Sequence, residues 1–245
     1  MNLHIYKTTE KVSEELAQWL SDEIAEVLSK QEFCTLVLSG GETPKPLFKK
    51  LATKEFQKKI NWQRVHIFWS DERVVPSNDS RNNAKNAYDL LIDHIDIPAN
   101  QVHIMRTDIE PNFAVDAYRA LLHEFFDNTS QTFDIVLLGM GDDGHTLSLF
   151  PGSTIIEDHK HWVNSVYNAE QEMYRITLMP ILVNRASKIV FMVEGSGKAE
   201  VLKEVLEGEY QPTKLPAQII NPIDGDLHWF LDDAVAKKLS SKGDS

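Results

Sequence analysis

The sequence has very little cysteine and no long apolar run. Cys34 is the only cysteine among 245 residues, which excludes a disulfide bridge within the chain. It lies in the apolar run CTLVL, where a buried structural thiol is expected. No apolar run approaches the ~20 residues that a membrane-spanning helix needs. The first residues, MNLHIYKTTE, contain no hydrophobic signal core. We therefore expect a cytoplasmic protein without a membrane partner.

Positive charge is also scarce, with 25 Lys and Arg residues against 37 Asp and Glu residues and a formal net charge of −12. Such a surface repels nucleic acid, so no nucleic-acid partner is expected. It also repels an anionic metabolite at long range. Any phosphate site must therefore be a local cluster of cations and backbone N–H groups.

Linkers, internal repeats and low-complexity segments are absent as well, which predicts a single α/β domain over residues 1–239 and a disordered tail at 240–245. Apolar runs rich in branched residues predict strands, and segments of helical periodicity alternate with them. This alternation predicts a mostly parallel, Rossmann-like open sheet with helices on both faces. Strands are expected at residues 3–7, 34–38, 65–69, 102–105, 133–138, 162–167, 188–193 and 227–231, and helices include 11–30, 83–94 and 111–126.

The stretch FDIVLLGMGDDGHTLSLFPG, residues 133–152, combines a buried strand with a glycine-rich acidic turn. Open α/β sheets bind their ligands at such turns. His145 is the one side chain of this turn whose ordinary pKa lies near neutrality, which makes it the candidate general base. The alternative is a structural corner, with glycines for tightness and aspartates as caps.

A second glycine-rich turn, Ser39-Gly40-Gly41, follows the strand at 34–38 and precedes Thr43-Pro44. Pro44 suits the first turn of a helix, and Thr43 is expected to cap it. Free N–H groups at the start of a helix suit a phosphate. A capped tight turn without a ligand is the alternative.

Three cations follow other strands or turns. Arg73, in the run SDER, is expected to bind phosphate oxygens, held by Asp71 or Glu72. Arg175 precedes an apolar helix start, and Lys198 lies at a junction of strand, glycine and helix. The alternatives are a surface salt-bridge cluster for Arg73 and a solvated first-turn lysine for Lys198.

The remaining histidines give no sign of a metal site. His159 and His161 lack the spacing of a site with a third ligand, and we expect them on the surface. His228 alternates with large apolar residues, which is typical of a histidine in the core or at its rim.

Taken together, these motifs resemble the 6-phosphogluconolactonase family. The resemblance rests on SGG at 39–41, WSDER at 69–73, GMGDDGHTLSLFPG at 139–152, RITL at 175–178, Gly197-Lys198 and DGDLHWFLD at 224–232. It implies a deaminase-like α/β fold and hydrolysis of 6-phosphogluconolactone to 6-phosphogluconate in the oxidative pentose phosphate pathway. It implies no metal or organic cofactor. The run AEQEMY at 169–174 departs from the Lys-Pro-Pro-like run of that family.

The related glucosamine-6-phosphate deaminases are the main alternative. They typically have Asp-Glu-Tyr where this chain has Asp71-Glu72-Arg73, and a motif ending in Asn-Glu-Pro where this chain has Ser148-Leu149-Phe150-Pro151. Both differences favour the lactonase. A sugar-phosphate sensor without catalysis is a second alternative, against which the histidine of the Asp-Gly-His turn argues.

The expected mechanism is general-base catalysis without a covalent nucleophile. His145 deprotonates a water molecule, and Asp143 or Asp142 orients its imidazole. The 6-phosphate lies on the N–H groups of Ser39, Gly40 and Gly41. Arg73, Arg175 and Lys198 supply positive charge. The partner is the small phosphorylated lactone, and a monomer or weak homodimer is expected.

Overall fold

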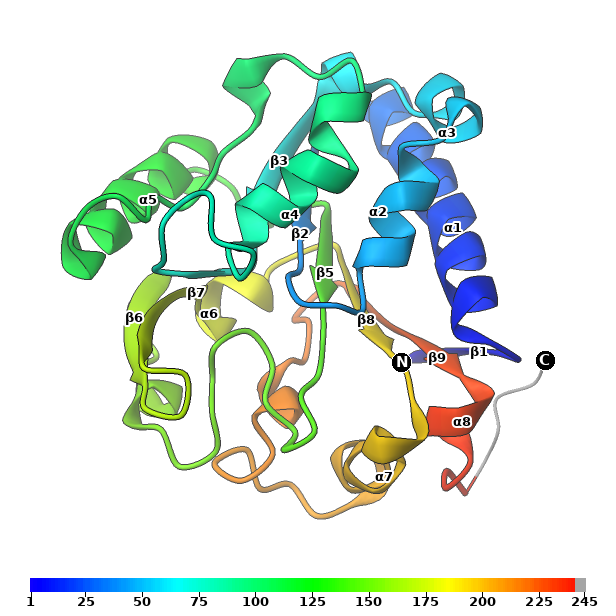
Figure 1. The fold of residues 1–245 in the computed structure, drawn as a ribbon, viewed down its shortest axis with the longest axis vertical. Helices are drawn as coiled ribbons and strands as arrows, with labels where there is room; N and C mark the ends of the chain where they lie inside the picture. Colours follow the sequence, from blue (N-terminus) through cyan, green and yellow to red (C-terminus); the bar gives the residue numbers. More distant parts are fainter. Residues whose placement is uncertain (241–245) are drawn as a thin grey trace.

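The computed structural model describes residues 1–240, and a six-stranded sheet forms its centre (Figure 1). Residues 241–245 of the predicted tail lie outside the described residues. The strand order is β1-β9-β8-β5-β2-β3, and every neighbouring pair is parallel. This confirms the predicted parallel α/β sheet. The strands are β1 (Asn2–Tyr6), β2 (Cys34–Leu38), β3 (Val65–Trp69), β5 (Ile135–Leu138), β8 (Lys188–Val193) and β9 (Asp226–Asp232).

Helices cover both faces of this sheet because the strands are buried on both sides. On one face, Leu36 and Val190 pack in a core with α1 (Thr9–Lys30), α2 (Lys45–Leu51), α3 (Lys54–Lys59) and α4 (Asn83–Leu90). On the other face, Val37 and Phe191 pack in a second core with α5 (Pro111–Phe126), α6 (Pro180–Val183), α7 (Ala199–Glu207) and α8 (Asp233–Ala236). Figure 1 shows α1 to α3 together on one side and α7 and α8 on the other.

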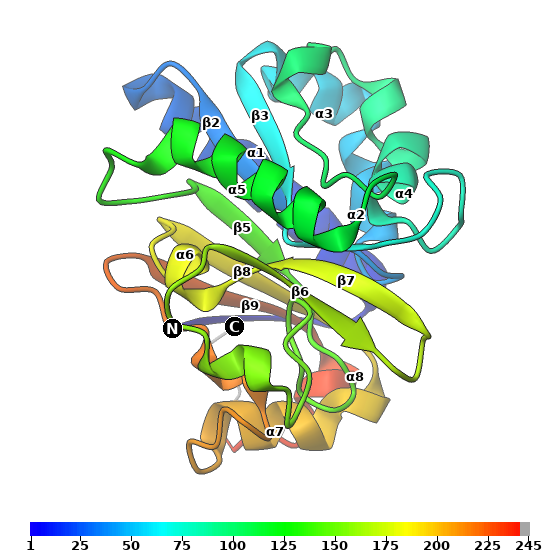
Figure 2. The same cartoon turned by 90° about the vertical axis from the view of Figure 1, so that its left-hand side faces the viewer.

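A small antiparallel sheet, which the sequence did not predict, adjoins the second core. Its order is β4-β7-β6, formed by β4 (Asp71–Arg73), β6 (Val163–Asn168) and β7 (Met173–Leu178). Figure 2 shows the β6–β7 hairpin on the same side of the molecule as α5. A single residue, Ser70, separates β3 of the central sheet from β4 of the small one. The chain therefore passes directly from one sheet to the other.

Several local predictions were wrong. Residues 102–105 form no strand, since Val102 makes only an isolated bridge to Ile67. Arg175 lies inside a strand, β7, that the sequence did not predict, because that segment pairs with β4, while the expected apolar helix begins as α6 at Pro180. The helix expected over 83–94 ends as α4 at Leu90 and is followed by a short 3-10 helix. The 3-10 helices are Trp62–Arg64, Ile92–His94, Ala99–Gln101, Thr154–Glu157, Ser196–Lys198 and Pro216–Ile219.

Other predictions are confirmed. Cys34 is buried, and burial raises the pKa of its thiol. His161 is exposed, and its Nδ1 lies 2.8 Å from Asp158. Within residues 1–240, no helix is both long and apolar enough to cross a membrane.

Candidate functional site

A cavity of about 260 Å³ opens where β2, β3 and β5 end. The chain runs outward from β2 to β3 and returns to β5 on the other side of β2, so the strand order reverses between β2 and β5. Ligands of open α/β sheets bind at such a point. The lining residues are Ser39, Gly40, Gly41, Glu42, Thr43, Ser70, Asp71, Arg73, Gly139, Met140, Gly141, His145, Leu147, Arg175 and Lys198.

The turn after β2 is shaped by its two glycines. Gly41 has a φ of +90°, a backbone conformation that residues with a side chain rarely adopt. At Gly40, a Cβ atom would lie 2.1 Å from Oδ1 of Asn83, so only glycine fits against that side chain. The prediction that Thr43 caps the next helix is wrong. Pro44 holds the cap position of α2 and makes no side-chain cap hydrogen bond, while Thr43 lines the cavity.

Two arginines face each other across the small sheet. Arg73 of β4 and Arg175 of β7 are direct register partners, and both line the cavity. Like charges in such a pair are unfavourable. Burial lowers the pKa of Arg73, and Arg175 lowers it further. The Nε atom of each arginine is buried without a hydrogen-bond partner among the described residues. The two arginines therefore have N–H groups without acceptors and excess positive charge. A bound oxyanion would accept hydrogen bonds from those groups and balance the charge.

Asp71 holds Arg175, not Arg73. Its Oδ2 lies 2.7 Å from Nη2 of Arg175 and accepts a hydrogen bond of 2.6 Å from the Ser148 hydroxyl. Burial alone would raise the pKa of Asp71, but the two arginines outweigh burial and hold it below its usual range. The expectation that Asp71 or Glu72 fixes the Arg73 guanidinium is wrong. Arg73 donates through Nη1 to the backbone carbonyl of Arg81.

Glu72 stabilises the start of α4. Its carboxylate accepts hydrogen bonds from the backbone N–H groups of Arg73 and Asn83 at 2.7 Å and of Ala84 at 2.8 Å. Burial raises the pKa of Glu72 to about 7, although these hydrogen bonds oppose the shift. Glu72 does not line the cavity, so its contribution to the site is to place Asn83 beside Gly40.

His145 meets one of its two candidate aspartates. Its Nδ1 lies 2.6 Å from Oδ1 of Asp143, and its backbone N–H donates to the same oxygen at 3.0 Å. Burial alone would raise the pKa of Asp143, but the hydrogen bonds from His145 hold it below its usual value. Asp142 points elsewhere: its side chain is 83% exposed and lies 3.9 Å from Nζ of Lys198.

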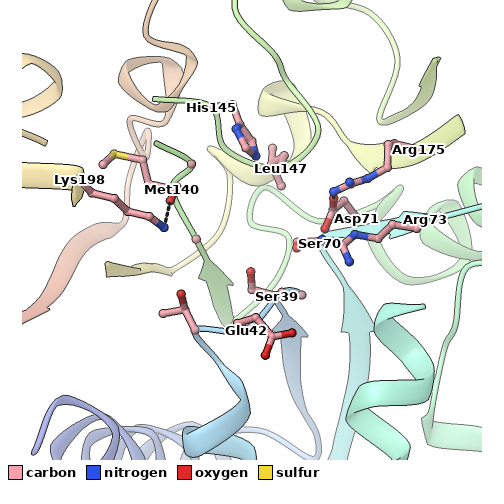
Figure 3. A pocket seen from close by; sticks show the side chains of 15 residues that line it. Ser39, Glu42, Ser70, Asp71, Arg73, Met140, His145, Leu147, Arg175 and Lys198 are labelled. Atoms are coloured by element: carbon pink, nitrogen blue, oxygen red, sulfur yellow. Dashed lines mark hydrogen bonds and ion pairs between the residues drawn. The ribbon is translucent and has the colours of Figure 1, made fainter. Parts of the chain in front are cut away.

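Lys198 reaches the cavity from the other side of β5. It lies at the N-terminus of α7, and its Nζ donates to the backbone carbonyl of Met140 at 2.6 Å. Figure 3 shows Lys198 on one side of the cavity and Arg73 and Arg175 on the other, with His145 between them in this view. Lys198 is thus a positioned cation and not a freely solvated lysine.

The structure therefore brings together the predicted residues of five separate segments. Sequence reasoning missed Ser148, Asn83, Ser70 and Leu147, which support or line the cavity. Ser70 had a usable signal, since it follows a buried strand directly. Asn83 had none, because its position depends on contacts made after folding.

His228 lies outside the cavity. It is 8% exposed, and its Nδ1 lies 3.0 Å from Nε2 of His4, as expected of a histidine at the rim of the core. Within residues 1–240, no three His, Cys, Asp or Glu side chains are grouped so that they could hold a metal ion.

Known proteins resemble this chain over most of its length. A protein named 6-phosphogluconolactonase from Aggregatibacter actinomycetemcomitans is 39% identical over 202 residues, covering 82% of this chain and 86% of that protein. The crystal structure of a protein called devB has a TM-score of 0.88 at 31% identity, covering 98% of this chain and 99% of that one. A monomeric glucosamine-6-phosphate deaminase has a TM-score of 0.83 at 21% identity, covering 97% and 99%, which shows a shared fold.

The model of one protein family accounts for nearly the whole sequence. It matches residues 7–229, a range that contains every segment of the cavity described above. The chain belongs to the family of glucosamine-6-phosphate isomerases and 6-phosphogluconolactonases.

Proposed function

We propose that this chain hydrolyses 6-phosphogluconolactone to 6-phosphogluconate, as its relatives' name indicates, in the oxidative pentose phosphate pathway. One observation supports this most strongly. A single cavity contains a histidine paired with a carboxylate, a turn rich in backbone N–H groups and three cations. Hydrolysis of a lactone that carries a phosphate group needs a base near the lactone carbonyl and an anion site for the phosphate, within one substrate length of each other.

The chemistry assigned to His145 is that of a general base. Its Nδ1 is held by Asp143, which leaves Nε2 to take a proton from water. The water oxygen then bonds to C1 of the lactone, the bond between C1 and the ring oxygen breaks, and the ring oxygen receives a proton. The product is the open acid, which ionises in water. In this proposal Asp143 is the residue that orients His145, and Asp142, whose side chain is turned toward Lys198, has no such role.

The phosphate binds at the opposite end of the substrate. The backbone N–H groups of Ser39, Gly40 and Gly41 and the side chain of Thr43 surround its oxygens, and Arg73, Arg175 and Lys198 balance its charge. The unpartnered Nε atoms of the two arginines support this placement. A cofactor has no step in this mechanism.

A coupled assay with freshly generated lactone tests the proposal, with the spontaneous rate subtracted. His145→Ala should lower kcat by about 10²–10⁴-fold, the usual contribution of a general base, while binding of 6-phosphogluconate persists. Retention of wild-type kcat in that variant would show that His145 is not the base.

The same protein preparation separates the alternatives. Release of ammonia from glucosamine 6-phosphate would indicate a deaminase. Binding of 6-phosphogluconate without lactone turnover would indicate a sensor.

The proposal includes a monomer or weak homodimer with no nucleic-acid partner, which sedimentation with and without DNA would test.

A further inference from the structure

The segment that carries His145 is fastened to the arginine pair through Ser148. The Ser148 hydroxyl donates to Oδ2 of Asp71 at 2.6 Å, and Arg175 occupies the same oxygen at 2.7 Å. All three side chains are at least nine-tenths buried. Between His145 and Ser148, Leu147 has a φ of 57°, a left-handed conformation that is costly for leucine. A change in the position of Arg175 would therefore be transmitted to the segment of His145 through Asp71 and Ser148, which are buried and hydrogen-bonded.

A second set of contacts, through Phe150, connects Arg175 with His145. The guanidinium carbon of Arg175 lies 5.9 Å from the centre of the Phe150 ring, within the range of a cation–π interaction. His145 is also a neighbour of that ring, with its ring centre 4.8 Å away. Phe150 is thus a neighbour of both the guanidinium and the imidazole. Arg175 contacts the segment 145–150 at Ser148 through Asp71 and at Phe150 directly.

Arg175 is itself incompletely held without an anion. It directly faces Arg73, and Asp71 is its one salt-bridge partner among the described residues. Its Nη1 donates to Gln171, which lies in the exposed turn of the β6–β7 hairpin, and its Nε has no described partner. An oxyanion between the arginines would remove their repulsion and fix the guanidinium. Through Asp71 and Phe150, it would also fix His145.

We propose that an oxyanion bound at Arg175 organises His145 for catalysis, with Asp71, Ser148 and Phe150 as positioning residues. Inorganic phosphite should therefore activate hydrolysis of glucono-1,5-lactone, which has the substrate's ring without its phosphate. Binding energy from a remote group that raises turnover in this way is a general property of enzymes. Phosphite takes part in no bond change, since water still supplies the oxygen and the ring oxygen still leaves. This inference rests on the proposed function.

The experiment measures kcat/KM for glucono-1,5-lactone with and without saturating phosphite, after subtraction of the spontaneous rate. We expect activation of about tenfold or more in the wild type, since correct placement of a catalytic group contributes at least this much. Ser148→Ala should reduce the activation ratio about tenfold, the effect of losing one hydrogen bond to a charged group. Phe150→Leu should reduce it by about threefold, the effect of losing a cation–π contact. Phosphite should bind both variants with an affinity close to that of the wild type.

Ser153→Ala is the matched control, because Ser153 lies in the same loop and makes no side-chain cap hydrogen bond. A variant that is merely destabilised loses activity with and without phosphite alike and keeps its activation ratio. Phe150 is only partly buried, so Phe150→Leu serves as the second variant if Ser148→Ala does not fold.

The results separate this inference from the function on which it rests. If the wild type hydrolyses the phosphorylated lactone but phosphite does not activate the unphosphorylated one, the coupling is overturned and the proposed function stands. An unchanged activation ratio in both folded variants also overturns it. If the phosphorylated lactone is not hydrolysed, the proposed function itself fails.

Discussion

A single carboxylate oxygen, Oδ1 of Asp143, binds both the imidazole Nδ1 of His145 at 2.6 Å and its backbone N–H at 3.0 Å. The two contacts fix the ring relative to the main chain that carries it. They also place the proton of the neutral imidazole on Nδ1 and leave Nε2 as the basic atom. Asp143 thus sets both the orientation and the tautomer of the proposed base.

Asp143→Asn should therefore lower kcat by about 10²–10⁴-fold, as loss of a correctly presented base does. An asparagine can present its N–H₂ group to Nδ1 and stabilise the other tautomer. Asp142→Asn is the comparison, and its effect on kcat should be far smaller because that carboxylate does not contact His145. Steady-state kinetics of both variants test this, and equal losses would contradict the role of Asp143.

Arg73→Gln should weaken binding of 6-phosphogluconate. Loss of a hydrogen bond to a charged group costs about 1.5–3 kcal/mol, which corresponds to a rise in Kd of about 10- to 150-fold. Isothermal titration calorimetry measures the effect. Arg106→Gln is the control, because Arg106 forms an exposed pair with Asp108 outside the cavity. An unchanged Kd in Arg73→Gln would remove Arg73 from the phosphate site.

Gly40→Ala should both destabilise the protein and raise KM. The new Cβ atom would lie 2.1 Å from Oδ1 of Asn83. The Asn83 side chain must then move, which breaks the hydrogen bond that its Nδ2 donates to the backbone carbonyl of Asp71. Such overpacking costs about 1–3 kcal/mol of unfolding free energy. Gly197→Ala is the control, since a Cβ atom there would have no atom beyond its chain neighbours within 4 Å. Chemical denaturation and kinetics should show a clear difference between the two variants.

Two half-buried histidine pairs predict acid sensitivity. Nδ1 of His66 lies 2.9 Å from Nε2 of His103, and His4 contacts His228 in the same way. Burial, with the neighbouring histidine, lowers the pKa of His103 to about 4 and that of His228 to about 4. Between pH 6.5 and about 4, the unfolded chain therefore binds more protons than the native one, and stability falls as the pH falls.

Thermal unfolding as a function of pH tests this. Tm should fall as the pH is lowered from 6.5 toward 4, and His103→Gln should flatten the decrease. Each kcal/mol corresponds to about 2–4 °C for a chain of this size. His159→Gln, at an exposed position, should leave the slope as it is. Equal slopes for wild type and His103→Gln would contradict the prediction.

Much of the central sheet was predictable because its strands are buried on both faces. The runs at 34–38, 65–69 and 188–193 match β2, β3 and β8 residue for residue. The cavity followed from the same reasoning, since turns after neighbouring parallel strands meet at one edge of the sheet. The fold class could thus be predicted from local patterns of apolar residues along the sequence.

The small sheet was not predictable in this way. β4 has three residues, all charged, and its partner β7 lies about a hundred residues later in the chain. That pairing places Arg73 opposite Arg175 and brings Asp71 into a salt bridge with Arg175. Neither contact can be predicted from a local sequence pattern. The supporting residues Asn83 and Ser148 were missed for the same reason.

The pairing of β1 with β9 joins residues 2–6 to residues 228–232, two segments that lie far apart along the chain. Contacts of such long sequence separation slow the search for the native state. A polypeptide truncated before Asp226 would leave β1 without its partner and bare one side of β8, with unpaired backbone groups that invite aggregation. Completion of this sheet therefore has to wait until residues 226–232 have left the ribosome.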